Sequence, residues 1–324
     1  MKLPRRQFLH LVAGAAASPA VSRFAWAATY PTRPVRIIVP FAPGGGYDAV
    51  ARPLANRLSE VWGQQVIVES KSGAGGTIGA QTAAQSSPDG YTLFLAGNSL
   101  VNSQYIYPSI GYDPVRDFAP VTLVCMFPNL MVVPNSSRAK SVREFIDYAK
   151  SNSVSYASSG IGTSVHLSGE LFKRMAGVQM THVPYRGIGP ALNDLIPGRV
   201  DVMFGTMTGT RSQADNGVIR ALAVTSAIRS PLAQDIPTIA ESGVPGFDVS
   251  TWYALFLPVK APAEIVMKIH DDVVAATAHP SVRQRLEDLG AVGTPSSPSE
   301  LAAYLQSEMA KWAPIIKEAG IKPE

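Results

Sequence analysis

The sequence predicts an α/β protein of two domains, each built on a mainly parallel sheet flanked by helices, with strands that cross between them. Three observations support this fold class. Apolar strand-like segments alternate with helix-like segments through most of the chain, which is typical of βαβ units. Glycine-rich turns follow several of these strands. Two further apolar runs lie where the chain would pass from one domain to the other.

The first expected domain begins with a continuous apolar strand over residues 35–39. Apolar side chains then recur at helical spacing over residues 50–61, which predicts a helix. Further strands are expected over 66–69 and 91–95, the latter after a Pro-Asp-Gly turn. This order is that of βαβ units, whose strands run parallel.

Two segments are expected to connect the domains. The first, over residues 121–133, consists of two apolar runs joined by Phe127-Pro128-Asn129, and the second covers residues 251–257. The predicted division places residues 28–124 and 252–324 in domain 1 and residues 125–251 in domain 2.

A second α/β set lies between the crossings. Strands are expected over residues 154–157, 200–204 and 221–225, with a helix over 166–175. After the second crossing, apolar residues recur at helical spacing over 265–316, and we expect these helices to pack on domain 1.

The first 27 residues have the features of an export signal. Paired arginines, Arg5 and Arg6, precede a weakly apolar, alanine-rich stretch, and Ala25-Trp26-Ala27 fits a cleavage site between small residues. Paired arginines are typical of the twin-arginine route and also occur in general secretory signals. We therefore expect cleavage after Ala27 and a periplasmic location.

The signal also explains the basic charge. The whole chain carries a formal charge of +4, with 28 basic and 24 acidic residues. Residues 1–27 contain four basic residues and no acid, so their removal leaves 24 of each sign. A neutral mature chain offers no basic surface for a nucleic acid, and we expect none as a partner.

A glycine turn after the first strand is the first candidate site. Its residues are Gly44, Gly45, Gly46, Tyr47 and Asp48. A turn between a strand and a helix presents free backbone N–H groups, which suit an anion. Asp48 is expected to cap the following helix.

The same turn has the GxGxxA form, and Glu69 lies 23 residues after Gly46. This pattern resembles a dinucleotide fingerprint in which the acid holds the ribose. The alternative function is therefore an exported hydrolase or an NAD-dependent oxidoreductase. Export argues against it, because nicotinamide cofactors are scarce outside the cytoplasm, and we expect no cofactor.

A second glycine-rich loop lies between another strand and helix. Its candidate residues are Ser158, Ser159, Gly160, Gly162, Thr163 and Ser164, followed by His166. Hydroxyl and N–H groups of this kind bind carboxylates. Ser164 and His166 are two residues apart on a helix, which is poor spacing for a nucleophile and its base.

Other candidates lie at the ends of expected strands, where open α/β sheets bind ligands. They are Asn98, Tyr185, Arg186 and Thr206. The lone cysteine, Cys125, lies in an apolar run and is expected to be a buried core residue. No Cys/His cluster has metal-ligand spacing, so we expect neither a metal nor a catalytic residue.

Taken together, the segments resemble the substrate-binding receptors of tripartite tricarboxylate transporters, the Bug family, over nearly the whole mature chain. The segments that carry the resemblance include Val35-Arg36-Ile37-Ile38-Val39-Pro40-Phe41, Gly73-Ala74-Gly75-Gly76-Thr77, Pro88-Asp89-Gly90-Tyr91-Thr92, His166-Leu167-Ser168-Gly169-Glu170, Val183-Pro184-Tyr185-Arg186-Gly187 and Pro237-Thr238-Ile239-Ala240-Glu241. Two residues depart from the family pattern, Pro53 and the bulky Tyr47. We expect Tyr47 to reshape the cleft or to stack on a planar ligand.

The resemblance implies a type II-like periplasmic-binding-protein fold with a ligand cleft between the domains. It implies a non-catalytic receptor that captures a small aliphatic or aromatic carboxylate through the loops at 44–48 and 158–164. The expected partners are permease subunits of a tripartite transporter or a sensor protein, and the receptor is expected to be a monomer.

Overall fold

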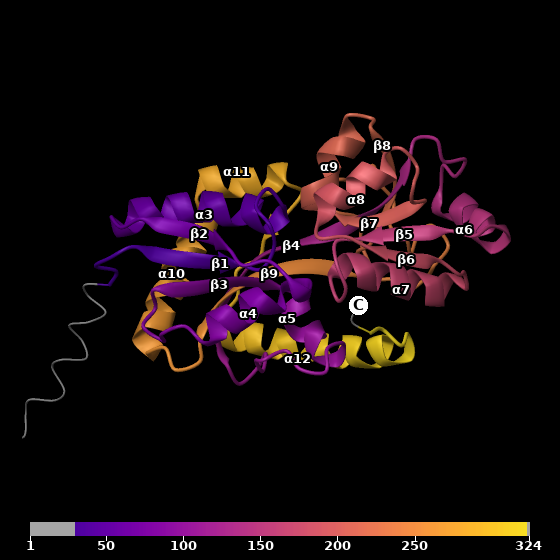
Figure 1. Ribbon diagram of the computed structural model, residues 1–324. Coiled ribbons are helices and arrows are strands. Elements are labelled where there is room, and N and C mark those ends of the chain that lie inside the picture. Colours follow the sequence, from indigo (N-terminus) through magenta and orange to yellow (C-terminus); the bar gives the residue numbers. More distant parts are fainter. Residues whose placement is uncertain (1–29, 323–324) are drawn as a thin grey trace, which may run out of the picture.

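The computed structural model describes residues 30–322, and the export-signal prediction at 1–27 lies outside that range. Helices cover both faces of a ten-stranded mixed sheet with the order β2-β1-β3-β9-β4-β7-β5-β6, and β8 and β10 both pair with β4 (Figure 1). The strands are β1 (Val35–Val39), β2 (Val66–Ser70), β3 (Thr92–Gly97), β4 (Phe118–Pro134), β5 (Ser155–Ser158), β6 (Thr181–Pro184), β7 (Val202–Thr206), β8 (Ile219–Val224), β9 (Ser250–Pro258) and β10 (Val292–Gly293).

The helices begin mostly after strands, as βαβ units require. They are α3 (Gly46–Trp62), α4 (Thr77–Ala84), α5 (Ser99–Asn102), α6 (Val142–Ser151), α7 (Ser164–Ala176), α8 (Ile188–Leu195), α9 (Met207–Asp215), α10 (Ala263–Ala278), α11 (Pro280–Asp288) and α12 (Pro298–Glu318). Two short 3₁₀ turns, η1 (Ala74–Gly76) and η2 (Ser103–Tyr105), complete the set.

The prediction of an α/β fold with two domains is confirmed. We call the half around β1, β2 and β3 domain 1 and the half around β5, β6 and β7 domain 2. Within each half these three strands are parallel. The expectation of a mainly parallel sheet in each domain is therefore confirmed, and the exceptions are the two crossing strands: β4 and β9 run antiparallel to each other and to their other neighbours. The reason is that the chain crosses between the domains on β4 and returns on β9.

The two apolar runs of the first crossing form one continuous strand, β4, which passes through Pro128. Its first part pairs with β9, as far as Pro128 opposite Ser250. From Asn129 onward it pairs with β7 and β8 in domain 2. Because Asn129 pairs directly with Thr206, the strand enters domain 2 without a loop.

Four buried clusters form the core, one on each face of the sheet in each domain. In domain 1, α3, α10 and α11 cover one face, and α4, α5 and the start of α12 cover the other. In domain 2, α6 and α7 cover one face of the sheet and α8 covers the other.

Helix α12 packs on both domains, which the sequence did not predict. Leu301 and Leu305 lie in the core of domain 1, as expected. Trp312 and Ile316, about two and three turns beyond Leu305, lie in the core of domain 2. Figure 1 shows this helix running beneath both halves of the sheet. The C-terminal helices therefore do not all belong to domain 1.

Candidate functional site

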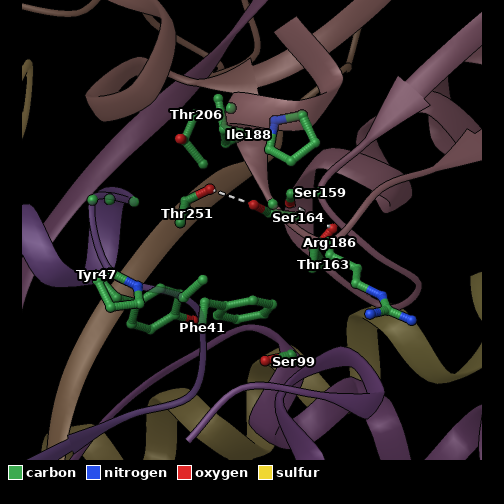
Figure 2. A pocket seen from close by; sticks show the side chains of 18 of the residues that line it. Phe41, Tyr47, Ser99, Ser159, Thr163, Ser164, Arg186, Ile188, Thr206 and Thr251 are labelled. Carbon is green, nitrogen blue, oxygen red and sulfur yellow. Dashed lines mark hydrogen bonds between the residues drawn. The ribbon is translucent and has the colours of Figure 1, made fainter. Parts of the chain in front are cut away.

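A cavity of about 160 Å³ lies between the two domains, at the carboxyl ends of the parallel strands (Figure 2). Domain 1 contributes the turn after β1, including Gly44, Gly45 and Gly46. Domain 2 contributes residues at the starts of α7 and α8, and β9 contributes Thr251 and Tyr253. The predicted first and second loops thus face one cavity.

Within residues 30–322, five helices begin at this cavity: α3 and the short α5 from domain 1, and α7, α8 and α9 from domain 2. The first N–H groups of a helix have no partner within it. Within residues 30–322, the N–H groups of Gly46, Tyr47, Ser164 and Val165 form no backbone or side-chain hydrogen bond. Together with the helix dipoles, these donors give the cavity a positive potential without a metal.

Asp48 is not the helix cap that the sequence predicted. The cap position of α3 is Gly45, and the helix begins at Gly46, so Asp48 lies in its first turn. From there its Oδ2 accepts hydrogen bonds from the N–H of Gly44, over 3.1 Å, and from Nε of Arg52, over 2.8 Å. Asp48 is buried and does not line the cavity, so it holds the glycine turn from behind.

An aromatic stack forms the domain 1 wall of the cavity. The ring of Tyr47 lies 4.0 Å from that of Tyr253 and 5.1 Å from that of Phe41, at interplanar angles of 28° and 30°. Gly97 leaves room for the Tyr47 hydroxyl, because a Cβ there would overlap it. Burial raises the pKa of both tyrosines, so their hydroxyls stay protonated.

Hydroxyl groups from the second loop form the opposite wall. Thr163 caps α7 by accepting from the N–H of His166, and its own hydroxyl donates to the carbonyl of Gly160 over 2.7 Å. Ser164 and Thr251 share a hydrogen bond of 2.6 Å, which ties the loop to the second crossing strand. Figure 2 shows these side chains facing the cavity together with Ser159.

Ser158, Gly160, Gly162 and His166 do not line this cavity, although all four were candidates. Ser158 is fully buried and hydrogen-bonds Nε2 of His182 over 2.7 Å. Gly160 faces a neighbouring cavity, and Gly162 donates its N–H to Nδ1 of His166 over 3.2 Å. These four residues therefore support the loop, whereas Ser159, Thr163 and Ser164 of the same loop line the cavity.

The two histidines behind the loop form a parallel stack. Their ring centroids are 4.0 Å apart, with an interplanar angle of 12°. Burial lowers the pKa of His182 to about 4 and also lowers that of His166, which His182 and Lys173 depress further. Because Nδ1 of His166 accepts a hydrogen bond, this ring is neutral.

The remaining candidates fall into two groups. Asn98, Arg186 and Thr206 line the cavity, and Arg186 makes no ion pair within residues 30–322. Tyr185 lines a neighbouring cavity, and its hydroxyl donates to Asp194 over 2.7 Å.

Phe41, Thr251 and Tyr253 line the cavity but were not candidates, and Ser99, beside the candidate Asn98, also lines it. Thr251 and Tyr253 alternate along the second crossing strand and so share a face. Because this strand was expected to connect the domains, side chains on its cavity face could have been predicted from the alternation of residues along the strand.

The alternative enzymatic interpretations find no geometric support. Glu69, the acid required by a dinucleotide fingerprint, pairs with Lys71 over 2.7 Å and does not line the cavity. The hydroxyl of Ser164 bonds Thr251 and not His166. Cys125 is fully buried, and burial raises its pKa. Among residues 30–322, no group of three or more His, Cys, Asp or Glu residues could hold a metal ion.

A cavity between two α/β domains, connected by crossing strands and lined by helix N-termini, defines the class of solute-binding proteins. The chain belongs to the tripartite tricarboxylate transporter family of receptors, whose family model matches residues 50–321. It is similar to Bug proteins, including protein BugT of Bordetella pertussis, at 34% identity over 91% of both chains. A UPF0065 protein encoded in the tcbD–tcbE intergenic region of Pseudomonas sp. strain P51 is 40% identical over 89% of this chain and 87% of the relative.

Solved structures agree with this assignment. Rpa4515 of R. palustris, determined with adipate, has a TM-score of 0.88 and 38% identity, covering 91% of this chain and all of that one. MatC of Rhodopseudomonas palustris, with bound malate, has a TM-score of 0.83 and 34% identity over 89% of this chain and all of that one. The chain is therefore a solute-binding receptor, and the family implies a periplasmic location.

No helix within residues 30–322 is both long and apolar enough to span a bilayer.

Proposed function

We propose that this receptor captures a small organic carboxylate in the interdomain cavity and delivers it to the permease of a tripartite transporter or to a sensor protein. Two similar proteins have been determined with adipate and with malate, which supports a carboxylate as ligand. The protein acts as a non-catalytic monomer without a cofactor, exported with cleavage after Ala27.

One observation carries this proposal: helix N-termini from both domains open on the same cavity. Hydrogen bonds from N–H groups to a carboxylate are charge-assisted and contribute about 1.5–3 kcal/mol each. Because α3 lies in domain 1 and α7 in domain 2, a carboxylate bridging them interacts best when the domains are together. The ligand therefore has a higher affinity for the closed arrangement of the domains than for the open one, and this difference allows it to favour closure.

The test uses protein purified from periplasm and unfolded and refolded to remove retained ligand. Thermal unfolding is measured with a panel of carboxylates, each paired with its uncharged amide. We expect at least one carboxylate to raise the unfolding temperature and its amide to have little effect. Equal stabilisation by the amides, or binding of NAD detected by protein fluorescence, would contradict the proposal. Native mass spectrometry before refolding gives the mass of any ligand retained from the cell.

A further inference from the structure

We propose that the ligand is a monocarboxylate with a single aromatic ring. This inference rests on the proposed function and specifies its ligand. Three features of the cavity carry it: an aromatic wall, a volume that matches one ring, and a single cationic side chain among the residues that line it.

The aromatic wall offers a flat face to the ligand. Phe41, Tyr47 and Tyr253 are stacked with nearly parallel planes, and all three line the cavity. Phe41 is the outer member of this stack, because it also lines the neighbouring cavity of about 680 Å³. In Figure 2 its ring lies on the side of the cavity opposite the hydroxyls of Ser159 and Ser164. A planar ring can therefore stack on Phe41 while its carboxylate reaches the hydroxyls and N–H groups.

The volume matches a single ring. The cavity measures about 160 Å³. An apolar protein cavity of about 150 Å³ is known to hold one benzene molecule. A ligand with two fused rings would have to extend past Phe41 into the neighbouring cavity, which shares Phe41, Ser159 and Arg186 with this one.

The charge favours a monoanion. Among residues 30–322, Arg186 is the only side chain lining the cavity that is charged at neutral pH, since burial keeps both tyrosines protonated. The neighbouring cavity adds no further charged side chain from the part of the chain that the structure describes. The second carboxylate of a dicarboxylate would have to share the neutral N–H and hydroxyl donors of the cavity with the first, and burying a second charge without a cation of its own is unfavourable.

The experiment compares three ligands by titration calorimetry with the full mature protein: benzoate, cyclohexanecarboxylate and adipate. Benzoate and cyclohexanecarboxylate carry the same charge and differ in planarity. We expect benzoate to bind about two- to tenfold more tightly than cyclohexanecarboxylate, the usual range for ring stacking. We expect adipate to bind more weakly than benzoate.

The variant Phe41→Leu keeps an apolar side chain and removes the ring. We expect it to bind benzoate and cyclohexanecarboxylate about equally tightly, so that the preference for benzoate is lost. Tyr148→Leu is the matched control, because Tyr148 is an exposed aromatic residue of α6 outside the cavity. Phe41→Met replaces Phe41→Leu should the latter not fold.

The results separate the two proposals. If adipate or cyclohexanecarboxylate binds as tightly as benzoate, this inference is wrong and the receptor function stands. If Phe41→Leu retains the preference for benzoate, the aromatic wall does not select the ligand. If no carboxylate of the larger panel binds, the proposed function itself fails.

Discussion

The carboxylate of Glu308 accepts a hydrogen bond of 3.2 Å from the side-chain amide of Asn98, although the two residues lie 210 positions apart. Asn98 lines the cavity at the end of β3, and Glu308 lies in the middle of α12. The same oxygen of Glu308 also accepts from the indole N–H groups of Trp252, over 3.0 Å, and Trp312, over 3.2 Å. This buried acid thus joins the cavity, a crossing strand and the helix that packs on both domains.

Replacing Glu308 with Leu should strongly destabilise the protein. Three buried donors would lose their acceptor, and each unpaired donor costs about 1–3 kcal/mol. We expect the free energy of unfolding to fall by about 3 kcal/mol or more in Glu308→Leu and by less in Glu308→Gln, which keeps an accepting oxygen. Urea unfolding measures this. The control is Glu318→Leu in the same helix, which removes an exposed ion pair with Arg174 worth at most about 1 kcal/mol. Equal losses in Glu308→Leu and Glu318→Leu would exclude the role given to Glu308.

Replacing Gly46 with Ala should hold the domains apart. A Cβ at Gly46 would lie 2.6 Å from Oγ1 of Thr208 in domain 2 and 2.9 Å from the hydroxyl of Tyr253. We expect carboxylate affinity to fall about tenfold or more while the unfolding temperature changes little. Calorimetric titration and thermal unfolding measure the two effects.

A second variant separates domain contact from direct obstruction of the ligand. Thr208→Ala removes the nearer of the two clashing atoms, so the double variant Gly46→Ala/Thr208→Ala should regain part of the lost affinity. If the double variant binds no better than Gly46→Ala, the added methyl group acts on the ligand itself.

Stability should decrease as the pH falls from about 6.5 toward 4. Burial lowers the pKa of His182 to about 4 and that of His166 below its usual value, so the unfolded chain takes up protons before the folded one. Protonated histidines therefore favour unfolding in this window, and the full stabilisation is present above pH 6.5.

The measurement is the free energy of urea unfolding at pH 7, 6, 5 and 4.5. We expect the pH dependence to be smaller in His182→Gln than in His279→Gln, which alters a partly exposed histidine that bonds Ser281 and does not contact this stack. A pH dependence that is the same in His182→Gln as in the native protein would rule out the histidine stack as its source.

Replacing Asp48 with Ala should loosen the first glycine turn. The N–H of Gly44 would lose its carboxylate acceptor, at a cost of about 1 kcal/mol in the free energy of unfolding. Arg52→Ala removes only a half-exposed partner of the same carboxylate and should cost less. Hydrogen exchange of the Gly44 amide gives the direct test, with faster exchange expected in Asp48→Ala. Unchanged exchange would show that the turn is held by other contacts.

Elements with a strong local pattern could be predicted from the sequence. The strand at residues 35–39 has the predicted bounds, and the helix after the first glycine turn begins at Gly46, close to where its periodicity starts. The predicted capping role of Asp48 was wrong by three positions, because the cap falls at Gly45. Glycine caps a helix without a side-chain signature, so the sequence favoured the nearest carboxylate.

The packing of α12 could not be predicted in the same way. Its apolar residues have a common helical spacing, and nothing in that spacing separates Leu305 from Trp312. They enter different cores because the helix is long enough to pass beneath both domains.

The sequence by itself determined the alternation of strands and helices, the two glycine loops at strand ends and the family, because each of these depends on neighbouring residues or on their order. Only the tertiary structure decided which polar groups face the ligand. Ser159, Thr163 and Ser164 line the cavity, whereas Ser158 and His166 lie behind it. The physical reason is that the orientation of the loop depends on partners far along the chain, such as Thr251, which is 87 positions from Ser164.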